Sequence, residues 1–401
     1  MRSLALAGGL VLAGALAFTA VAVSAPGRDQ QPAAAVAPFT ETLQSRLRRL
    51  PGDYRSWARL GVEYVDQARV TGDPASYSRA EGALATAARL APDDDAVLTG
   101  QAALAAGRHD FALAARLAGR AVAANPYSAA AYGVLADART QLGDLRNARA
   151  AIDKQLSLHP GVAAFARASY AAELRGDVRA ARAFMQDALQ DANTPSDIAY
   201  SRYYLGELAL HAGRLDTANR WYATALEAYP AFTPAMAGQA RVAALSGRLQ
   251  EALALYERVV ARLPLPQYLV EQGETHIKAG LPADWTLLSA QRRLFQAAGV
   301  RDDLTWAEFE ADHGDPARAV RHARAEYARN PNLVAADALS WALYKSGKPR
   351  EALKYAKRAT ATGWRNPLLA HHRAVIERAL GKPVREVPRI DPQLPALARF
   401  S

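Results

Sequence analysis

The sequence predicts an all-α solenoid, because one pattern of small residues repeats along nearly the whole chain. Nine glycines recur at intervals of 33 to 37 residues, and each follows another small residue by seven positions. A fixed period in this range is typical of repeat proteins in which each unit buries its apolar face against the next. The nine pairs of small residue and glycine are Gly100/Gly107, Ala136/Gly143, Ser169/Gly176, Gly206/Gly213, Ala240/Gly247, Gly273/Gly280, Ala307/Gly314, Ser340/Gly347 and Ala374/Gly381.

A single unit, residues 200–230, predicts two antiparallel helices. Apolar residues fall at helical spacing before Gly213, and a second amphipathic run passes through Ala218 and ends at Pro230. Gly213 suits the left-handed conformation that ends a helix. Gly206 and Ala218 are small, so we expect the two helices to approach each other closely at these positions.

The first unit resembles the tetratricopeptide repeat, a helix-turn-helix unit of 34 residues. The residues that carry the resemblance are Trp57, Leu60, Gly61, Tyr64, Ala80, Leu84, Ala87 and Pro92. The resemblance implies a right-handed superhelix of about nine helix pairs plus a terminal helix, Leu368–Leu380. It also implies a protein-binding scaffold, although the fold alone does not name a partner.

The repeats occupy residues 40–381, and three irregularities stand out within this range. Residues 70–74 fall in a turn lengthened by an insertion of seven residues. Trp285 replaces the usual small residue, and the run from Ala283 to Ala298 predicts a lengthened second helix. Residues 40–50 predict a short capping helix. Residues 382–401 predict an irregular tail whose apolar residues, among them Leu394, cover the last helix.

The amino-terminal segment predicts export. Residues 4–25 are uncharged and apolar, which is typical of a signal peptide or of a membrane anchor within residues 1–25. Residues 26–39 predict a flexible linker. The chain has no cysteine, which excludes a lipid-modified cysteine, disulfides and thiolate sites.

The charge and the scattered histidines favour binding over catalysis. The formal net charge is +10, but nucleic-acid binding needs a continuous basic face, and we expect solvated helix faces instead. His371 and His372 are neighbours that point about 100° apart on a helix, so they do not share one metal ion. The cluster Asp312-His313-Gly314-Asp315 is interpreted as an inter-helix turn. We therefore expect no enzyme activity, no cofactor and no metal.

The first helix of each unit is expected to line the concave surface, where acidic and aromatic residues recur. An acidic, aromatic groove suits an extended peptide that carries Arg or Lys, and it disfavours nucleic acid because phosphates are repelled. The expected groove residues are Asp137, Tyr170, Glu173, Tyr203, Glu207, Arg241, Glu274, Glu308, Asp337, Trp341 and Tyr344.

Three alternatives remain open at this stage. Charged concave positions also occur simply because they keep a helix face soluble. A basic outer face including Lys345, Lys348, Lys354, Lys357 and Arg358 would bind an anionic envelope polymer or lipid. The chain would also suit an accessory subunit of an enzyme complex. A protein or peptide partner, with membrane attachment through residues 4–25, is the leading hypothesis.

Overall fold

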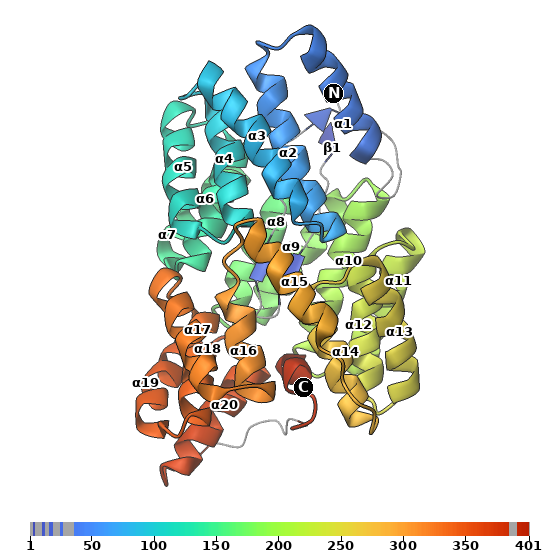
Figure 1. Ribbon diagram of the computed structural model, residues 1–401, viewed down its shortest axis with the longest axis vertical. Coiled ribbons are helices and arrows are strands. Elements are labelled where there is room, and N and C mark those ends of the chain that lie inside the picture. Colours follow the sequence, from blue (N-terminus) through green and yellow to red (C-terminus); the bar gives the residue numbers. More distant parts are fainter. Residues whose placement is uncertain are drawn as a thin grey trace.

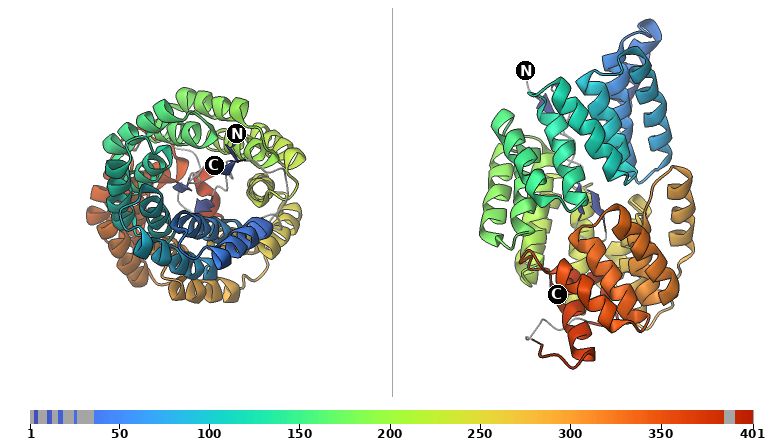
Figure 2. Two further views of the ribbon diagram at one scale, coloured as in Figure 1. Left: turned by 90° about the horizontal axis from the view of Figure 1, so that it is seen from above. Right: turned by 90° about the vertical axis from the view of Figure 1, so that its left-hand side faces the viewer.

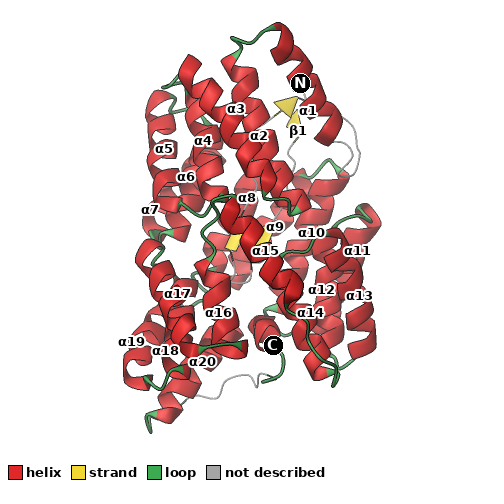
Figure 3. Ribbon diagram, viewed as in Figure 1, coloured by secondary structure: helices red, strands yellow, loops and turns green. Residues whose placement is uncertain are grey.

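The computed structural model describes residues 36–384 and 391–400, together with four short strands in the first 26 residues. Twenty α-helices account for nearly all of the described part (Figure 3). The strands are β1 (Ser3–Leu4), β2 (Leu10–Leu12), β3 (Leu16–Phe18) and β4 (Ala25–Pro26), paired antiparallel as β1 with β4 and β2 with β3. The described repeat region is entirely helical, which confirms the predicted α-solenoid.

Nine antiparallel helix pairs build the solenoid, with α1 (Val36–Arg49) before them and α20 (Pro367–Ala379) after them (Figure 1). The first helices of the pairs are α2 (Tyr54–Thr71), α4 (Asp95–Gly107), α6 (Ala129–Gln141), α8 (Val162–Glu173), α10 (Pro195–Leu210), α12 (Thr233–Leu245), α14 (Pro266–Lys278), α16 (Asp303–His313) and α18 (Leu333–Lys345). The second helices are α3 (Ala75–Leu90), α5 (Phe111–Ala124), α7 (Leu145–Leu158), α9 (Val178–Asp191), α11 (Leu215–Ala228), α13 (Leu249–Arg262), α15 (Thr286–Ala297), α17 (Pro316–Arg329) and α19 (Pro349–Ala359). Nine pairs and a terminal helix match the prediction.

The recurring glycines end the first helix of most pairs. Seven of the nine adopt φ between 65° and 78°, the left-handed region that glycine enters without strain. In the second unit, which carries two extra residues, His109 takes this conformation with φ 60° in place of Gly107. The glycine period therefore reports the turn that reverses the chain within each pair.

The small residues that precede the glycines allow the helices to approach closely. Gly206, Ala240 and Gly273 are all buried, as expected. A Cβ atom built on Gly206 would lie 2.5 Å from Cε1 of Tyr222 in the partner helix. The site has no room for even one methyl group.

The pairs wind into a right-handed superhelix. Seen from above, the chain runs clockwise from blue to red as it recedes from the viewer (Figure 2). Each first helix contacts the first helix of the next pair along the whole series from α2 to α20. The first helices therefore form the inner, concave wall, because helices on the inside of a curve lie closer together than those outside.

Successive turns of the superhelix touch along a seam of inter-helix loops, which the sequence did not predict. Asn332 Nδ2 donates to the backbone carbonyl of Gln141, 191 residues away, at 2.9 Å. The His109 ring meets the carbonyl of Arg301, 192 residues away, at 3.3 Å. One superhelical turn thus contains about 190 residues, or between five and six 34-residue repeats. The seam closes the inner wall into a ring.

Three local expectations differ from the structure. Helix α15 has 12 residues and is not lengthened, because Trp285 caps its start and fills the space beside Gly273. The insertion near residues 70–74 extends α2 to 18 residues. Helix α1 begins at Val36, inside the expected 26–39 linker.

The carboxyl-terminal tail also differs from its expected position. Residues 395–400 form a 3₁₀ helix, η2 (Pro395–Phe400), that contacts α14 as well as α20. The chain end lies inside the ring of helices (Figures 1 and 2). The tail therefore enters the concave side and does more than cover the last helix.

Most of residues 4–25 lie outside the described part, so the predicted signal peptide or anchor remains a prediction. Among the helices of residues 36–384 and 391–400, none is long and apolar enough to cross a membrane.

Candidate functional site

Along the middle of the solenoid, the expected concave charges are buried between neighbouring inner helices. Asp137 of α6 receives two hydrogen bonds from Arg167 of α8, at 2.9 and 2.7 Å. Arg241 of α12 lies between Glu207 of α10, at 3.5 Å, and Glu271 of α14, at 3.1 Å. These pairs join residues 30 or 34 positions apart, which is about one repeat. We call them the arginine ladder.

Tyrosines complete the arginine ladder. Tyr222 Oη donates to Glu207 at 2.5 Å, and Tyr256 Oη donates to Glu271 at 3.2 Å. Burial raises the pKa of both tyrosines well above its usual value, so both hydroxyls keep the proton that they donate. Glu207 and Glu271 thus each receive charged and neutral donors while buried between the helices.

The expectation that Tyr203, Glu207, Arg241 and Glu274 lie exposed in a groove is wrong. Tyr203 and Arg241 have an exposed fraction of 0%, and Asp137 is buried as well. Tyr203 packs against the rings of Tyr204, Tyr222 and Phe232. The physical reason is the close approach of the inner helices, which places the residue after each small position between two helices.

Two further expected groove residues lie near the seam. Tyr170 is half-buried against an apolar cluster formed with the last repeats. Glu173 accepts from His211 Nδ1 at 2.7 Å and from Trp364 Nε1 at 3.4 Å, the latter 191 residues away. These residues connect successive turns of the superhelix.

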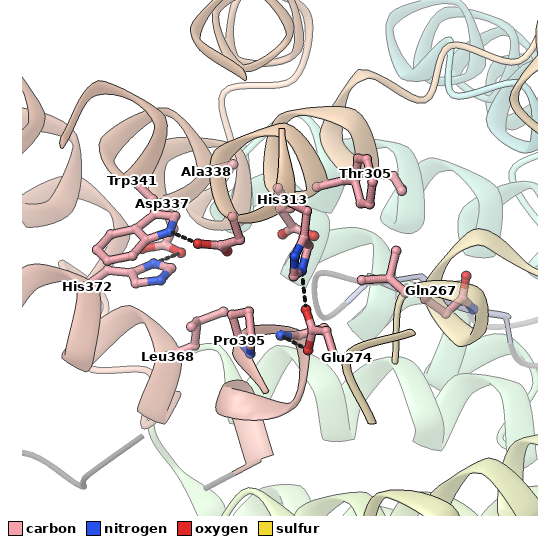
Figure 4. Close-up of a pocket in the computed structure, with 15 residues that line it drawn as sticks. Gln267, Glu274, Thr305, His313, Asp337, Ala338, Trp341, Leu368, His372 and Pro395 are labelled. Atoms are coloured by element: carbon pink, nitrogen blue, oxygen red, sulfur yellow. Dashed lines mark hydrogen bonds and ion pairs between the residues drawn. The ribbon is translucent and has the colours of Figure 1, made fainter. Parts of the chain in front are cut away.

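The remaining expected residues line one pocket, which we call the acidic pocket, except Tyr344, which stacks on Trp341 outside the lining. The pocket wall comes from the inner helices α14, α16, α18 and α20 (Figure 4). Glu274, Glu308, Asp337 and Trp341 were predicted from the sequence, and all four line it. Its full lining is Gln267, Val270, Glu274, Thr305, Glu308, Phe309, Asp312, His313, Asp337, Ala338, Trp341, Leu368, His372, Pro395 and Ala396.

Two histidine–carboxylate pairs face each other across the acidic pocket (Figure 4). His313 Nε2 lies 2.9 Å from Glu274 Oε1, and His372 Nδ1 lies 2.9 Å from Asp337 Oδ2. The Trp341 ring stacks on His372 with centroids 4.0 Å apart and planes at 10°. Each histidine comes from the inner helix next to that of its carboxylate, as in the arginine ladder.

A third carboxylate, Asp312, sits between Trp341 and Lys345. Its Oδ1 accepts from Trp341 Nε1 at 2.9 Å and lies 3.3 Å from Lys345 Nζ. The same ammonium lies 5.4 Å from the centre of the Trp341 ring. A cation held by a carboxylate and an indole face is thus already present beside the pocket, and Lys345 is turned toward it and not toward an outer basic face.

Burial leaves two carboxylates of the pocket in unusual states. It raises the pKa of Glu274 to about 7, against the opposing effect of the His313 hydrogen bond. Asp337 is 4% exposed, and its Oδ1 has no hydrogen-bond donor among the described residues. A buried carboxylate oxygen without a donor costs free energy, so this oxygen is a ready acceptor for a ligand.

Among the titratable residues of the lining, the sequence reasoning missed three, Asp312, His313 and His372. Asp312 and His313 were interpreted as an inter-helix turn, but both belong to α16 and point into the pocket. His372 was examined only as a metal ligand together with His371. The sequence did contain an indication of the His372–Asp337 pair, because the two residues are 35 positions apart, which is close to one repeat. Within the described residues, no group of histidines and acidic residues is arranged to hold a metal ion.

No protein-family model and no curated protein sequence matches this chain. Among solved structures, it is similar to a tetratricopeptide-repeat protein of Thermus thermophilus, with 25% identity over 44% of this chain and 92% of that one, and a TM-score of 0.39. It is similar to YrrB, "a TPR protein with an unusual peptide-binding site", with 16% identity over 45% of this chain and 92% of that one, and a TM-score of 0.31. It is also similar to the human IFIT1 dimer with PPP-AAAA, with 14% identity over 82% of this chain and 78% of that one, and a TM-score of 0.48. The tetratricopeptide-like fold itself is established by the helix pairs described above.

Proposed function

We propose that this protein is a non-catalytic interaction scaffold that binds a basic side chain of a partner polypeptide in the acidic pocket. The observation that carries the proposal is the buried Asp337 Oδ1, an acceptor without a donor among the described residues. A guanidinium or ammonium group supplies several N–H donors and a positive charge, which is what this oxygen lacks.

The electrostatics of the pocket support a cationic ligand. In the arginine ladder, the carboxylates are paired with guanidinium groups that are always charged. In the acidic pocket, Glu274 and Asp337 are paired with histidines, which carry a positive charge only when protonated.

The aromatic lining supports the same ligand class. Trp341 and Phe309 provide aromatic surface beside the carboxylates, a combination that attracts cations more strongly where water is excluded. The Lys345 ammonium already contacts the Trp341 ring and the Asp312 carboxylate from outside the pocket. Phosphates, such as those named with human IFIT1, would face repulsion from the acidic lining.

A random peptide library selected on the immobilised protein tests this proposal. We expect selected peptides to be enriched in Arg or Lys, and the tightest of them, called the probe peptide below, to lose at least about tenfold in affinity when Asp337 becomes Asn. Glu227→Gln, at an exposed position of the outer helix α11, is the matched control and should change nothing. Selection without basic residues, or equal loss in both variants, would contradict the proposal.

Salt and a competing oligonucleotide provide a second comparison. An aromatic-anchored site retains part of its affinity as salt rises, whereas binding to a basic outer face weakens steeply. A 5′-triphosphorylated oligoadenylate should not compete with the probe peptide. Competition at the Asp337 site would instead favour a nucleic-acid ligand.

Export also remains part of the proposal, and it rests on the uncharged run of residues 4–25. Residues 1–40 fused to a reporter that is active only outside the cytoplasm should produce signal. Replacing Leu10 and Leu12 with Arg should abolish that signal. Cytoplasmic retention of the unmodified fusion would contradict export.

A further inference from the structure

We propose that the carboxyl-terminal segment, residues 391–397, is a displaceable occupant of the acidic pocket that an external ligand must remove. Pro395 and Ala396 belong to the pocket lining, although they lie well beyond α18 in the chain. The backbone N–H of Ala396 donates to Glu274 Oε2 at 2.8 Å. The segment therefore already offers the pocket a hydrogen-bond donor, as the proposed ligand would.

The segment is held at three kinds of contact. At its start, Lys278 Nζ of α14 lies 3.0 Å from Asp391 and 3.0 Å from Gln393 Oε1. In its middle, Leu394 is 2% exposed and joins an apolar cluster whose other members come mainly from helices α8 to α13. Ala396 packs on the opposite side, against a cluster of α14, α15 and α16. The segment thus spans the inside of the ring between two walls (Figure 2).

The space that remains makes the two occupants mutually exclusive. The cavity beside Pro395 and Ala396 measures about 40 Å³, room for about three water molecules. An arginine side chain with its peptide backbone occupies a much larger volume than this cavity offers. External binding to Asp337 therefore requires the segment to leave. This step rests on the proposed function, whereas the docking of the segment itself does not.

The attachment is weak enough to be reversible. The Lys278–Asp391 pair is about one-third exposed on both sides, and solvent-exposed ion pairs contribute little to stability. Only Leu394 and Leu397 bury large apolar side chains completely within residues 391–397. The helices of the solenoid pack against one another through their own clusters, so we expect them to remain folded when the segment is released.

The first test uses the full chain with Leu394→Asp and Leu397→Asp, since two carboxylates are costly to bury in an apolar cluster. Leu287→Asp with Leu294→Asp is the matched control, because both leucines of α15 are exposed. A synthetic peptide of residues 391–401 is then added and followed by NMR up to millimolar concentration, the usual range for a tethered segment. We expect saturable binding to the released variant and at least about tenfold weaker binding to the wild type and the control.

Each other outcome overturns the proposal. Loss of helicity in the Leu394/Leu397 variant would make the segment a fixed part of the core. Absence of peptide binding, or equal binding to variant and wild type, would mean that the segment does not occupy a specific site. The same peptide with both leucines changed to Asp should not bind to any of the three proteins.

A charge exchange and the probe peptide complete the test. Lys278→Glu should weaken the docking of the segment, and Lys278→Glu with Asp391→Lys should restore it. In the Leu394→Asp/Leu397→Asp variant, the affinity for the probe peptide should rise about tenfold, because a larger fraction of the protein has an open pocket and is competent to bind. If residues 391–401 bind in trans but the probe peptide binds no variant, the segment's docking stands and the proposed function fails. If release leaves a measurable probe affinity unchanged, the proposed function stands and this inference fails.

Discussion

Two stretches of the same concave wall pair their acidic residues in different ways. In α6 to α14, acidic residues are paired with arginines one repeat away and are sealed between helices. In α14 to α20, the acidic residues Glu274 and Asp337 are instead paired with His313 and His372 of the next inner helix, beside a cavity. The arginine ladder is a structural element, and the acidic pocket has the properties of a binding site.

The difference shows that a solenoid sets where a residue lies but not what it does. In both regions the repeat brings acidic residues of one inner helix next to a neighbouring inner helix. The identity of its partner then decides the outcome. A guanidinium can form two hydrogen bonds and neutralises the carboxylate fully, whereas an imidazole forms one and leaves acceptor capacity.

The largest effect should follow from breaking the arginine ladder. Arg241→Met leaves Glu207 and Glu271 buried without their charged partner, which should cost about 3–5 kcal/mol in the free energy of unfolding. Urea denaturation followed by circular dichroism measures it. Arg248→Met, at a half-exposed pair with Glu251, is the control and should change stability by less than about 0.5 kcal/mol. Similar values for both would mean that the ladder is not structural.

The two aromatic residues expected to act together in a groove should now behave differently. Tyr203→Ala removes a fully buried ring and should cost about 3–5 kcal/mol of stability. Trp341→Ala should cost less stability, because the indole is only partly buried. It should, however, lower the affinity for the probe peptide at least about tenfold. Thermal melts and fluorescence anisotropy on both variants separate these effects. Loss of binding without loss of stability in Tyr203→Ala would reverse the assignment.

Close packing of the inner helices should give an intermediate effect. Gly206→Ala places a methyl group 2.5 Å from Tyr222, whose hydroxyl is bound to Glu207, so we expect a cost of about 1–3 kcal/mol. Gly247→Ala is not an adequate control, because Gly247 has a positive φ. Gly82→Ala, with open space around its Cα, should be neutral or slightly stabilising. Equal stability of the Gly206 and Gly82 variants, measured by thermal melts, would mean that the helices do not pack closely there.

A further effect concerns pH. Burial raises the pKa of Glu274 to about 7, so the folded protein binds a proton more tightly there than the unfolded chain does. Stability should therefore fall as pH rises from about 4.5 to about 7, and this contribution should be absent in Glu274→Gln. Urea midpoints at both pH values measure the difference. A wild type and variant with parallel pH profiles would contradict the raised pKa.

The sequence predicted the repeat architecture because glycine and small residues have steric roles that any repeat must satisfy. It placed Glu274, Glu308, Asp337 and Trp341 on the concave surface because helical spacing puts them on inner helices, but it did not predict the pocket that they line. It did not predict that Tyr203 and Arg241 are buried, since their burial depends on how closely neighbouring units approach. The seam and the position of residues 391–397 depend on contacts across 115 to 192 residues, which no local pattern encodes.

A double-mutant cycle between Asp337 and the probe peptide tests the central claim most directly. Affinities are measured for wild type and Asp337→Asn, each with the probe peptide and with its arginine or lysine replaced by glutamine. If this carboxylate receives the basic side chain, the two changes should be coupled by about 1–3 kcal/mol. Additive losses, with a coupling energy below about 0.3 kcal/mol, would show that the basic side chain binds elsewhere.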